Sequence, residues 1–338
     1  MRTLRRIAAQ AVLGAVLLAT AGCTAPEASA SVTVLCSNDA AICAAWAEDF
    51  ARQTGTAVTM DRLPTSEALE RIRRGEGLPE YDVWHGGGSE MYVAAAQEGL
   101  LAPYPSPQAE GIPAELREPR GRWTGVYVSF LGFCADAARL EQIGAPVPRS
   151  WEDLLDPALA GWVSAASPRT SGTAYTTMLV QLDRRGEQEG LDYLSRLYAQ
   201  VPQFTRSGTA PAQVVAQGEA AVGISFAPYC EAAAAAGAPV TTILPRDGTG
   251  YEVGAVAVLA DAPHPAAARR YVDHAVSEQG QRSGASSGIH QVPTQTGLPG
   301  SFGAVRGRLA APLLMAPLEE RAARRDALLD WFAAEVPQ

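Results

Sequence analysis

The chain has 338 residues, of which 47% are hydrophobic, and it carries a formal net charge of −9 at pH 7. A chain of this length can bury a substantial core and normally divides it between two domains. Its acidity and lack of a basic stripe argue against nucleic acid as a partner, and the complete absence of lysine excludes Schiff-base chemistry and a P-loop lysine.

The amino-terminal segment has the pattern of a bacterial lipoprotein signal. Arginines within the first six residues precede a short apolar run, which ends in small residues before Cys23. The run is too short to span a bilayer as a stable helix, so we expect processing rather than insertion. We predict a signal peptide at 1–22, lipidation of Cys23, a tether at 23–31 and an extracytoplasmic body, anchored to the outer face of the cell membrane or periplasmic. Thr20 stands where such sites usually have Leu, so ordinary secretion is the alternative.

Strands and helices alternate after the tether. A buried strand at Val32–Cys36 is followed by a helix that ends at Gly55, because glycine readily adopts the left-handed conformation of a helix C-cap. Next come a strand at Ala57–Leu63, a helix from Ser66, a strand at Tyr81–Trp84 and a helix at Ser89–Glu98 that Gly99 ends. This alternation is typical of a parallel sheet with ligand-facing loops at the carboxyl ends of its strands.

A proline-rich stretch, Pro103–Pro119, interrupts the alternation, and an apolar strand at Val126–Cys134 leads into a second lobe. The cycle restarts there, with strands at Trp162–Ala166 and Val222–Phe226, helices through Tyr198, after Pro211 and from Glu231, and strands at Val240–Leu244 and Tyr251–Leu259 that return the chain. We predict an α/β fold of two hinged lobes with a cleft between them, each a mostly parallel sheet flanked by helices. The first comprises residues 32–124 and 241–296, and the second residues 125–240 and 297–338.

Four cysteines remain after Cys23. An even number in an oxidising compartment predicts two disulfides. Cys36 and Cys43 are separated by only a short turn, so we pair them and, by remainder, pair Cys134 with Cys230. Four buried free thiols are the alternative. Metal binding is less favoured because no C-x-x-C spacing occurs.

Polar, glycine-bearing segments follow several of the predicted strands. Ser37, Asn38 and Asp39 follow the first strand, and the segment His85, Gly86, Gly87 follows the third. Such segments lie at the strand ends where two lobes would meet, so we expect them to face the cleft.

The segment Ser167–Thr173 precedes a predicted helix and suits an anion. The first turn of a helix leaves backbone N–H groups unpaired and carries a partial positive charge. Ser171 and Thr173 add hydroxyl donors, and Gly172 lets the backbone approach a ligand closely. The alternative is that Thr170 or Ser171 merely caps the helix.

A second segment of the same kind, Arg206–Pro211, opens the helix after Pro211. Arg206 can meet an anion with the bidentate geometry of a guanidinium, and Ser207 adds a hydroxyl. An isolated surface arginine is the alternative interpretation.

Three glycines bracket an aromatic and a carboxylate in Asp247–Gly254, at the expected return crossing. The glycines suit a hinge. Glu252 lies within an otherwise apolar strand, so it needs a partner if it is buried, either a ligand or a group within one lobe.

Catalytic and metal sites are poorly supported. Gly284–Gly288 matches the letters of a nucleophile elbow around Ser286, but that device needs a preceding strand, and a helix near Pro265–Ser277 precedes it here. A secreted serine hydrolase is therefore a minor alternative. The four histidines have no metal-ligand spacing, and no cofactor or metal is expected.

Seven blocks in order resemble one family along the whole mature chain. They are Tyr81–Gly88, Glu98–Tyr104, Trp123–Tyr127, Ser150–Pro157, Thr170–Tyr175, Arg206–Gly208 and Gly248–Gly254. The chain resembles the ferric-iron, phosphonate and sugar-phosphate branch of bacterial ABC-transporter solute-binding proteins, which have the type II periplasmic-binding fold.

The resemblance implies a two-lobed receptor, not an enzyme, that closes on a solute and delivers it to the permease and ATPase of an importer. It also implies that Ser171, Gly172 and Thr173 hold an anionic group. Ferric-binding members use adjacent tyrosines where this chain has Tyr229 alone, so a ferric receptor is the secondary interpretation, and a signalling receptor without a transporter is a third.

We therefore predict a monomer that binds a small anionic solute. The predicted ligand-binding residues are Ser37, Asn38, Asp39, Ser66, His85, Gly86, Gly87, Tyr127, Ser171, Gly172, Thr173, Arg206, Ser207, Phe226, Tyr229 and Glu252.

Overall fold

The computed structural model describes residues 31–75 and 80–336. The predicted signal peptide, the predicted lipidation site Cys23 and nearly all of the tether lie outside these residues. Within the described ranges, no helix is both long and apolar enough to cross a membrane.

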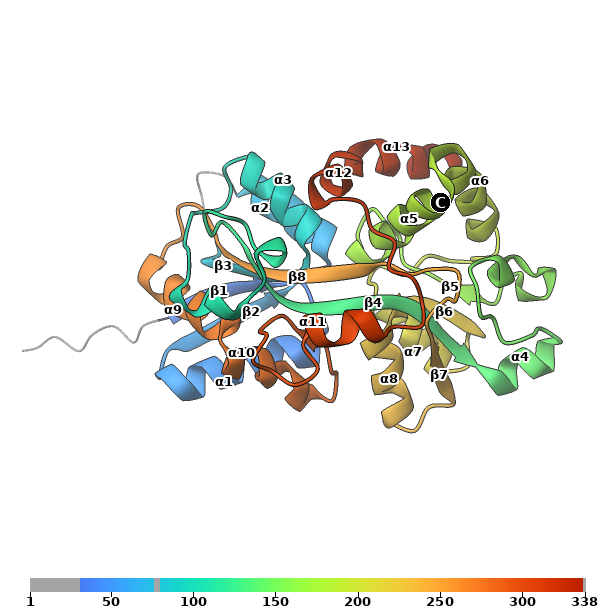
Figure 1. Ribbon diagram of the computed structural model, residues 1–338, viewed down its shortest axis with the longest axis horizontal. Coiled ribbons are helices and arrows are strands. Elements are labelled where there is room, and N and C mark those ends of the chain that lie inside the picture. The colour runs from blue at the N-terminus through green and yellow to red at the C-terminus, as the bar shows by residue number, and fades with distance from the viewer. Residues whose placement is uncertain (1–30, 76–79, 337–338) are drawn as a thin grey trace, which may run out of the picture.

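The first lobe begins with three parallel strands and the helices between them (Figure 1). Its elements are β1 (Ser31–Cys36), α1 (Ala40–Thr54), β2 (Ala57–Arg62), α2 (Thr65–Arg74), β3 (Val83–Gly88) and α3 (Ser89–Gln97). β1 pairs in parallel with both β2 and β3. The Asp39 side chain caps α1 by accepting from the Ala41 N–H at 2.8 Å, and Gly55, with φ of 68°, ends that helix. The carboxyl ends of these strands and the amino ends of these helices therefore face the same side.

Two long strands complete this sheet and continue toward the second lobe. β8 (Tyr251–Val258) inserts between β3 and β4 (Thr124–Asp136), antiparallel to both. β4 is buried along its whole length and pairs with β8 as far as Phe130. From Leu131 onward it pairs with β6 (Val222–Phe226), and from Phe133 also with β7 (Val240–Ile243). One continuous strand thus belongs to the sheets of both lobes.

The second lobe is built around the far half of β4. Its remaining elements are α4 (Ala137–Ile143), β5 (Val163–Ser164), α5 (Gly172–Arg185), α6 (Glu187–Tyr198), α7 (Ala210–Ala216) and α8 (Ala227–Ala235). Each lobe has its own aromatic core. Trp84 stacks on Tyr92 in the first, with ring centroids 4.0 Å apart, and Phe133 meets Trp151 edge-on at 4.8 Å in the second.

The carboxyl-terminal segment touches both lobes. It follows α9 (Pro265–Val276), α10 (Glu278–Ser283) and β9 (Val292–Pro293), and it contains α11 (Phe302–Val305), α12 (Leu318–Ala323) and α13 (Arg325–Glu335). α12 packs against α3 of the first lobe, whereas Phe332 of α13 packs against Tyr198 of the second. Before α12, the Leu314 N–H donates to the Thr249 carbonyl at 2.8 Å. The chain therefore passes between the lobes a third time.

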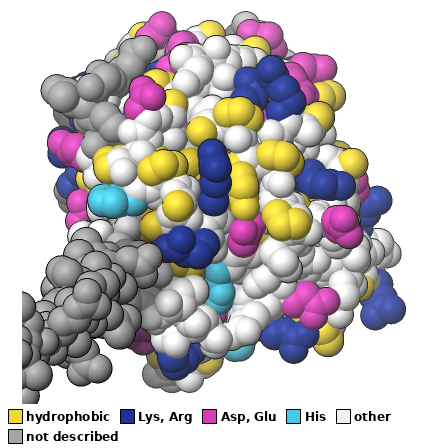
Figure 2. All heavy atoms as spheres, turned by 90° about the vertical axis from the view of Figure 1, so that its left-hand side faces the viewer, with side chains coloured by type: hydrophobic (Ala, Val, Ile, Leu, Met, Phe, Trp, Pro, Cys, Tyr) yellow, Lys and Arg dark blue, Asp and Glu magenta, His cyan; other side chains and the backbone are white. Residues whose placement is uncertain are grey.

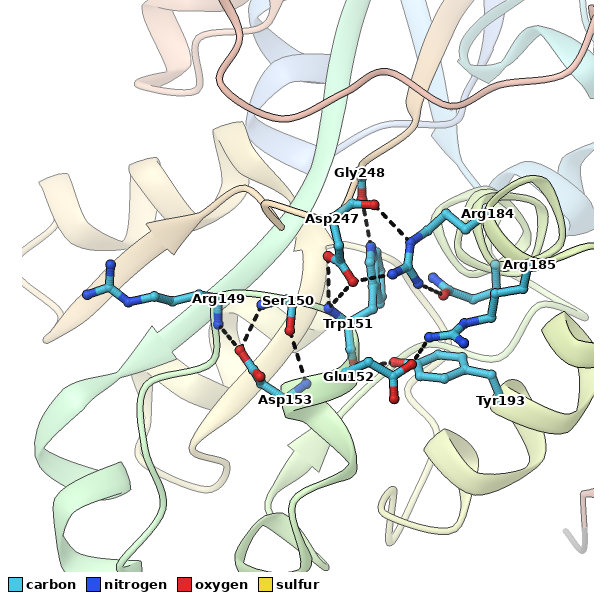
Figure 3. A network of polar contacts seen from close by, with 11 residues as sticks. Arg149, Ser150, Trp151, Glu152, Asp153, Arg184, Arg185, Tyr193, Asp247 and Gly248 are labelled. Atoms are coloured by element: carbon cyan, nitrogen blue, oxygen red, sulfur yellow. Dashed lines mark hydrogen bonds and ion pairs between the residues drawn. The ribbon is translucent and has the colours of Figure 1, made fainter.

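A polar network fixes the returning crossover to the second lobe (Figure 3). The Trp151 backbone N–H donates to the Asp247 carboxylate at 3.1 Å, and the Trp151 indole donates to the Gly248 carbonyl at 2.9 Å. Arg184 forms an ion pair with Asp247 and also donates to its carbonyl at 3.2 Å. Asp247 and Gly248 are therefore fixed to the second lobe immediately before the chain enters β8.

The predicted two-lobed α/β fold is confirmed, and so are both disulfides. Cys36 is bonded to Cys43, and Cys134 is bonded to Cys230. The sheets are mixed rather than mostly parallel, because β8 and β4 run antiparallel to their neighbours as they cross between lobes.

Several boundaries differ from those predicted. β3 continues through His85–Gly88, which we expected to be a loop, because Gly86 and Gly87 adopt positive φ and allow a bulge in its pairing with β8. α8 starts at Ala227 rather than at Glu231, since Pro228 is well suited to a first helical turn.

The lobe boundaries also shift. The first crossing comes after Phe130 rather than at residue 125, and residues 241–243 belong to β7 in the second sheet. Residues 297–338 are not confined to the second lobe, since α12 packs on α3. The first shift arises because β4 is one continuous strand whose partners change from β8 to β6 and β7 along its length.

Positive and negative side chains are interspersed on the end of the first lobe (Figure 2). The net negative charge is therefore not gathered into a single-sign field on this face.

Candidate functional site

A cavity lies between the two lobes. It holds about 330 Å³ of empty space, part of it open to solvent. Its walls come from β1, β2, α2 and β8 on one side and from the turns before α5, α7 and α8 on the other. The lining residues are Ser37, Asn38, Arg62, Pro64, Thr65, Ser171, Gly172, Thr173, Ser207, Gly208, Thr209, Phe226, Tyr229 and Glu252.

The amino-terminal turns of three helices lie in the cavity wall. Thr65 begins α2, Gly172 and Thr173 begin α5, and Phe226 is the N-cap of α8. Ser171 caps α5 by accepting from the Ala174 N–H at 3.4 Å, so capping and cavity lining coincide at this residue. The positive ends of three helix dipoles therefore lie in this wall, and such ends interact favourably with negative charge.

Arg62 is the arginine that reaches this cavity. Its Nε donates to the Asn38 carbonyl at 2.7 Å, and its Nη2 donates to Ser207 Oγ at 3.2 Å. Ser207 Oγ lies 2.7 Å from the Thr209 hydroxyl. Among the lining residues, Arg62 is the one that carries a formal positive charge at neutral pH.

Direct contacts close the lobes over the cavity. The Tyr229 hydroxyl of α8 donates to Asn38 Oδ1 at 2.7 Å, and the Ser66 N–H of α2 donates to the Thr170 carbonyl at 3.1 Å. Near the mouth, Arg206 forms an ion pair with Glu67 of α2. The two lobes are therefore in direct contact around the cavity.

Glu252 lies at the inner wall and is 4% exposed. The Tyr127 hydroxyl donates to its Oε1 at 3.3 Å, and that hydroxyl accepts from the Gly87 N–H at 3.0 Å. Burial raises the pKa of Glu252 to about 8, with the Tyr127 hydrogen bond acting weakly in the opposite direction.

The glycine pair in β3 makes room for this arrangement. A Cβ on Gly86 would lie 3.2 Å from the Ser37 carbonyl, and one on Gly87 would collide with Thr65. Both glycines have positive φ, at 89° and 79°. Larger residues at either position would therefore displace the strand end that carries Ser37 or the start of α2.

The structure brings together nine of the predicted site residues in the cavity wall. They are Ser37, Asn38, Ser171, Gly172, Thr173, Ser207, Phe226, Tyr229 and Glu252. The turns at Ser171–Gly172 and Ser207–Gly208 adjoin each other, because the Thr170 hydroxyl donates to the Arg206 carbonyl at 2.6 Å.

The other predicted site residues do not line the cavity. Gly86, Gly87, Tyr127 and Ser66 lie directly behind its wall, and Asp39 caps α1. His85 stacks on Trp46 with ring centroids 3.7 Å apart and lies 3.0 Å from the Tyr271 hydroxyl. Burial lowers the pKa of His85 to about 3, so it is a neutral core residue at physiological pH.

Arg206 requires a correction. Its side chain is 70% exposed, pairs with Glu67 and contributes only its backbone to the region of the two turns. Arg62 instead lines the cavity, where we had expected Arg206. We predicted a strand at Ala57–Leu63, and β2 ends at Arg62, so the place of Arg62 near a strand carboxyl end was the signal that could have identified it.

No group of three or more metal-ligating side chains occurs in residues 31–75 and 80–336. Asp39 and His85 do not converge on Tyr229, whose hydroxyl is bonded to Asn38. Ser286 lies in a short helical turn after α10, and its hydroxyl donates to the Ser283 carbonyl at 2.8 Å. Neither the ferric nor the hydrolase interpretation gains support from these positions.

Comparison with known proteins agrees with this architecture. Residues 87–299 match the bacterial extracellular solute-binding protein family. An uncharacterized protein of Haemophilus influenzae is 34% identical over 260 residues, which is 75% of each chain. The periplasmic binding protein AfuA of Actinobacillus pleuropneumoniae, solved with fructose 6-phosphate bound, superposes with a TM-score of 0.85 at 30% identity and covers 91% of this chain and 98% of its own. The periplasmic binding protein P5PA gives a TM-score of 0.85 at 28% identity, covering 91% and 100% of the two chains.

Proposed function

The chain belongs to the bacterial extracellular solute-binding proteins of ABC importers, and from this premise we propose that its solute is a small anion of the phosphate-ester or phosphonate class. The solute would be held between the lobes and delivered to the cognate permease. We further propose that the mature protein is a monomer tethered through lipid on Cys23 and has no enzymatic activity.

The observation that carries this proposal is the convergence of Arg62 with the first turn of α5 in one buried cavity. A guanidinium, a helix amino terminus and the hydroxyls of Thr173 and Ser207 provide several donors within a small volume. Such a set matches the several acceptor oxygens of a phosphoryl or phosphonyl group. The similar AfuA structure, with its bound fructose 6-phosphate, supports the same class of solute.

The proposed role of closure follows from the contacts between lobes. A solute that touches Arg62 of one lobe and Thr173 of the other favours the closed form by the free energy of those contacts. A permease could then distinguish loaded from empty protein by shape.

Calorimetric titration of the full chain in detergent tests the class of solute. The panel contains fructose 6-phosphate, an alkylphosphonate, inorganic phosphate, fructose and a ferric complex. We expect binding by at least one phosphorus-containing anion, none by fructose, and marked weakening in Thr173→Ala. Binding of the ferric complex alone, with Tyr229→Phe abolishing it, would overturn the anion proposal and favour a metal receptor.

A further inference from the structure

Glu252 is a buried carboxyl group in an anion-favouring cavity. Within residues 31–75 and 80–336, it makes no ion pair with an arginine or histidine. Its one side-chain hydrogen bond is with Tyr127, a neutral phenol. A buried carboxylate without a cation is costly, so either the group is neutral or its partner is brought by the ligand.

The two carboxyl oxygens of Glu252 have different surroundings. The Tyr127 oxygen accepts from the Gly87 N–H, so the Tyr127 proton is directed at Glu252 Oε1. Oε2 lies on the other side, where a Cβ built on Gly172 or on Gly88 would be 3.5 Å from it. Oε2 is therefore beside the first residue of α5, at the wall that favours an anion.

The titratable and charged groups around Glu252 come from the neighbouring elements packed against it. They are Tyr127 on β4, Tyr92 and Glu90 on α3, Tyr229 on α8, Arg321 on α12 and Arg62 on β2. Glu90 is paired with Arg321, and Arg62 is engaged with Asn38 and Ser207. Burial and Glu252 itself raise the pKa values of the three tyrosines, which stay protonated. No neighbour thus supplies a free positive charge to stabilise an ionised Glu252.

We propose that Glu252 is a specificity-determining residue that acts as the neutral acid, donating a hydrogen bond from Oε2 to an oxygen of the bound anion. This inference rests on the proposed function, since it takes the solute to be an anion. The burial that raises the pKa of Glu252 to about 8 is consistent with it. An ionised carboxylate at this position would repel the anion, whereas a neutral acid adds a donor without adding negative charge.

A hydrogen-bond donor at Glu252 would affect which solutes the cavity prefers. A solute with an oxygen beside its anionic group gains a hydrogen bond, whereas a solute with an ammonium at that position meets a neutral acid rather than a carboxylate. Sugar phosphates should therefore be preferred to aminoalkylphosphonates. Binding should also weaken by about tenfold for each pH unit above the pKa of Glu252.

The test has a ligand-free arm and a binding arm, both on the full chain in detergent. Infrared difference spectra between wild type and Glu252→Gln are recorded from about pH 7 to about pH 10, a range in which a phosphate ester is already a dianion. Affinity for fructose 6-phosphate and for 2-aminoethylphosphonate is measured by calorimetry over the same range. Glu187→Gln, an exposed substitution on α6, is the matched control, and Tyr127→Phe is a second variant.

We expect a protonated-carboxyl band near neutral pH that is absent in Glu252→Gln and disappears as the pH rises. The affinity of wild type for fructose 6-phosphate should fall over the same range. The affinity of Glu252→Gln should not change with pH, because its amide cannot ionise. At the alkaline end, this variant should bind fructose 6-phosphate more tightly than wild type does. Tyr127→Phe should move both transitions to higher pH, because the Tyr127 hydrogen bond favours the ionised form.

Three results would contradict the inference in distinguishable ways. Absence of the protonated band near neutral pH overturns it whatever binds. A flat wild-type affinity profile, or tighter binding of the aminoalkylphosphonate, overturns the donor role but leaves the anion receptor intact. If no phosphorus-containing anion binds while the band is present, the proposed function fails and the donor role fails with it.

Discussion

Arg62 Nη2 donates to Ser207 Oγ at 3.2 Å, which joins the end of β2 in the first lobe to the turn before α7 in the second. The same guanidinium lines the cavity. Replacing Arg62 with Gln should weaken binding of an anionic solute by about 2 kcal/mol, or roughly 30-fold, because a charged hydrogen bond is lost. Calorimetry with the best-binding anion measures the effect.

Arg206→Gln is the matched control for that substitution. Its ion pair with Glu67 is exposed and screened by solvent, so affinity should change no more than about fivefold. A larger loss in Arg206→Gln than in Arg62→Gln would reverse the assignment of the two arginines.

Gly208 has no room for a side chain. A Cβ there would collide with the Thr173 hydroxyl and lie 2.9 Å from Ser171 Oγ. Gly208→Ala should therefore displace the first turn of α5 and lower affinity by about tenfold or more, at a cost of about 1 to 3 kcal/mol. Gly307→Ala, at a position with no atom within 4 Å, should leave binding and melting temperature unchanged. Equal behaviour of the two variants would contradict the tight packing of the two turns.

The two disulfides should differ in their effect on stability. Cys134–Cys230 closes a loop across 96 residues, whereas Cys36–Cys43 spans only 7. On the loop-entropy model, replacing both cysteines of the longer bridge with Ala should cost about 5 kcal/mol, and replacing both of the shorter bridge should cost about 2 kcal/mol. Chemical denaturation of the two double variants gives the comparison, and an inverted order would show that enthalpy or residual structure outweighs loop entropy.

Arg321 and Glu90 form an ion pair in which the side chains are 4% and 2% exposed. Arg321→Met leaves the Glu90 carboxyl buried without its cation and should lower the free energy of unfolding by about 3 to 5 kcal/mol. Adding Glu90→Gln should recover most of that loss, because the uncompensated charge is then gone. If the double variant is no more stable than Arg321→Met, the penalty comes from lost packing instead.

The stability of the protein should depend on pH through Glu252. Since the pKa of Glu252 is raised from 4.5 to about 8, the folded protein holds this proton more tightly than the unfolded chain does. Its stabilising effect is complete below about pH 4.5 and is lost as the pH rises toward about 8. Relative to wild type, Glu252→Gln should gain up to about 5 kcal/mol between these limits. Urea denaturation across this range checks the sign, and a gain that grows toward acid pH would contradict it.

Most of the elements were predictable because their signals are local. Gly55 ends α1 as its position after an apolar run suggested, and the pairing of Cys36 with Cys43 followed from their spacing. The start of α5 at Ser171–Thr173, which lines the cavity, was also predictable from a local pattern of a glycine and two hydroxyls before a helix.

The rest depends on contacts between distant parts of the chain. Whether Arg62 or Arg206 reaches the cavity is decided by the way two lobes close, which no local pattern reports. The burial of His85 behind the cavity wall depends on Trp46 and Tyr271. We predicted the crossing at residue 125 rather than after Phe130, because a uniformly apolar strand gives no sign of where its pairing partner changes.

The position of β8 in the sheet constrains how the protein can form. β8 separates β3 from β4, so the first lobe lacks its central pairing until residues 251–258, which follow β4, β5, β6 and β7 in the chain, have been synthesised. The amino-terminal half of the chain therefore cannot complete this sheet before β8 is available. We therefore expect the first lobe to complete its sheet late, only after β8 has been made, whether folding accompanies or follows synthesis.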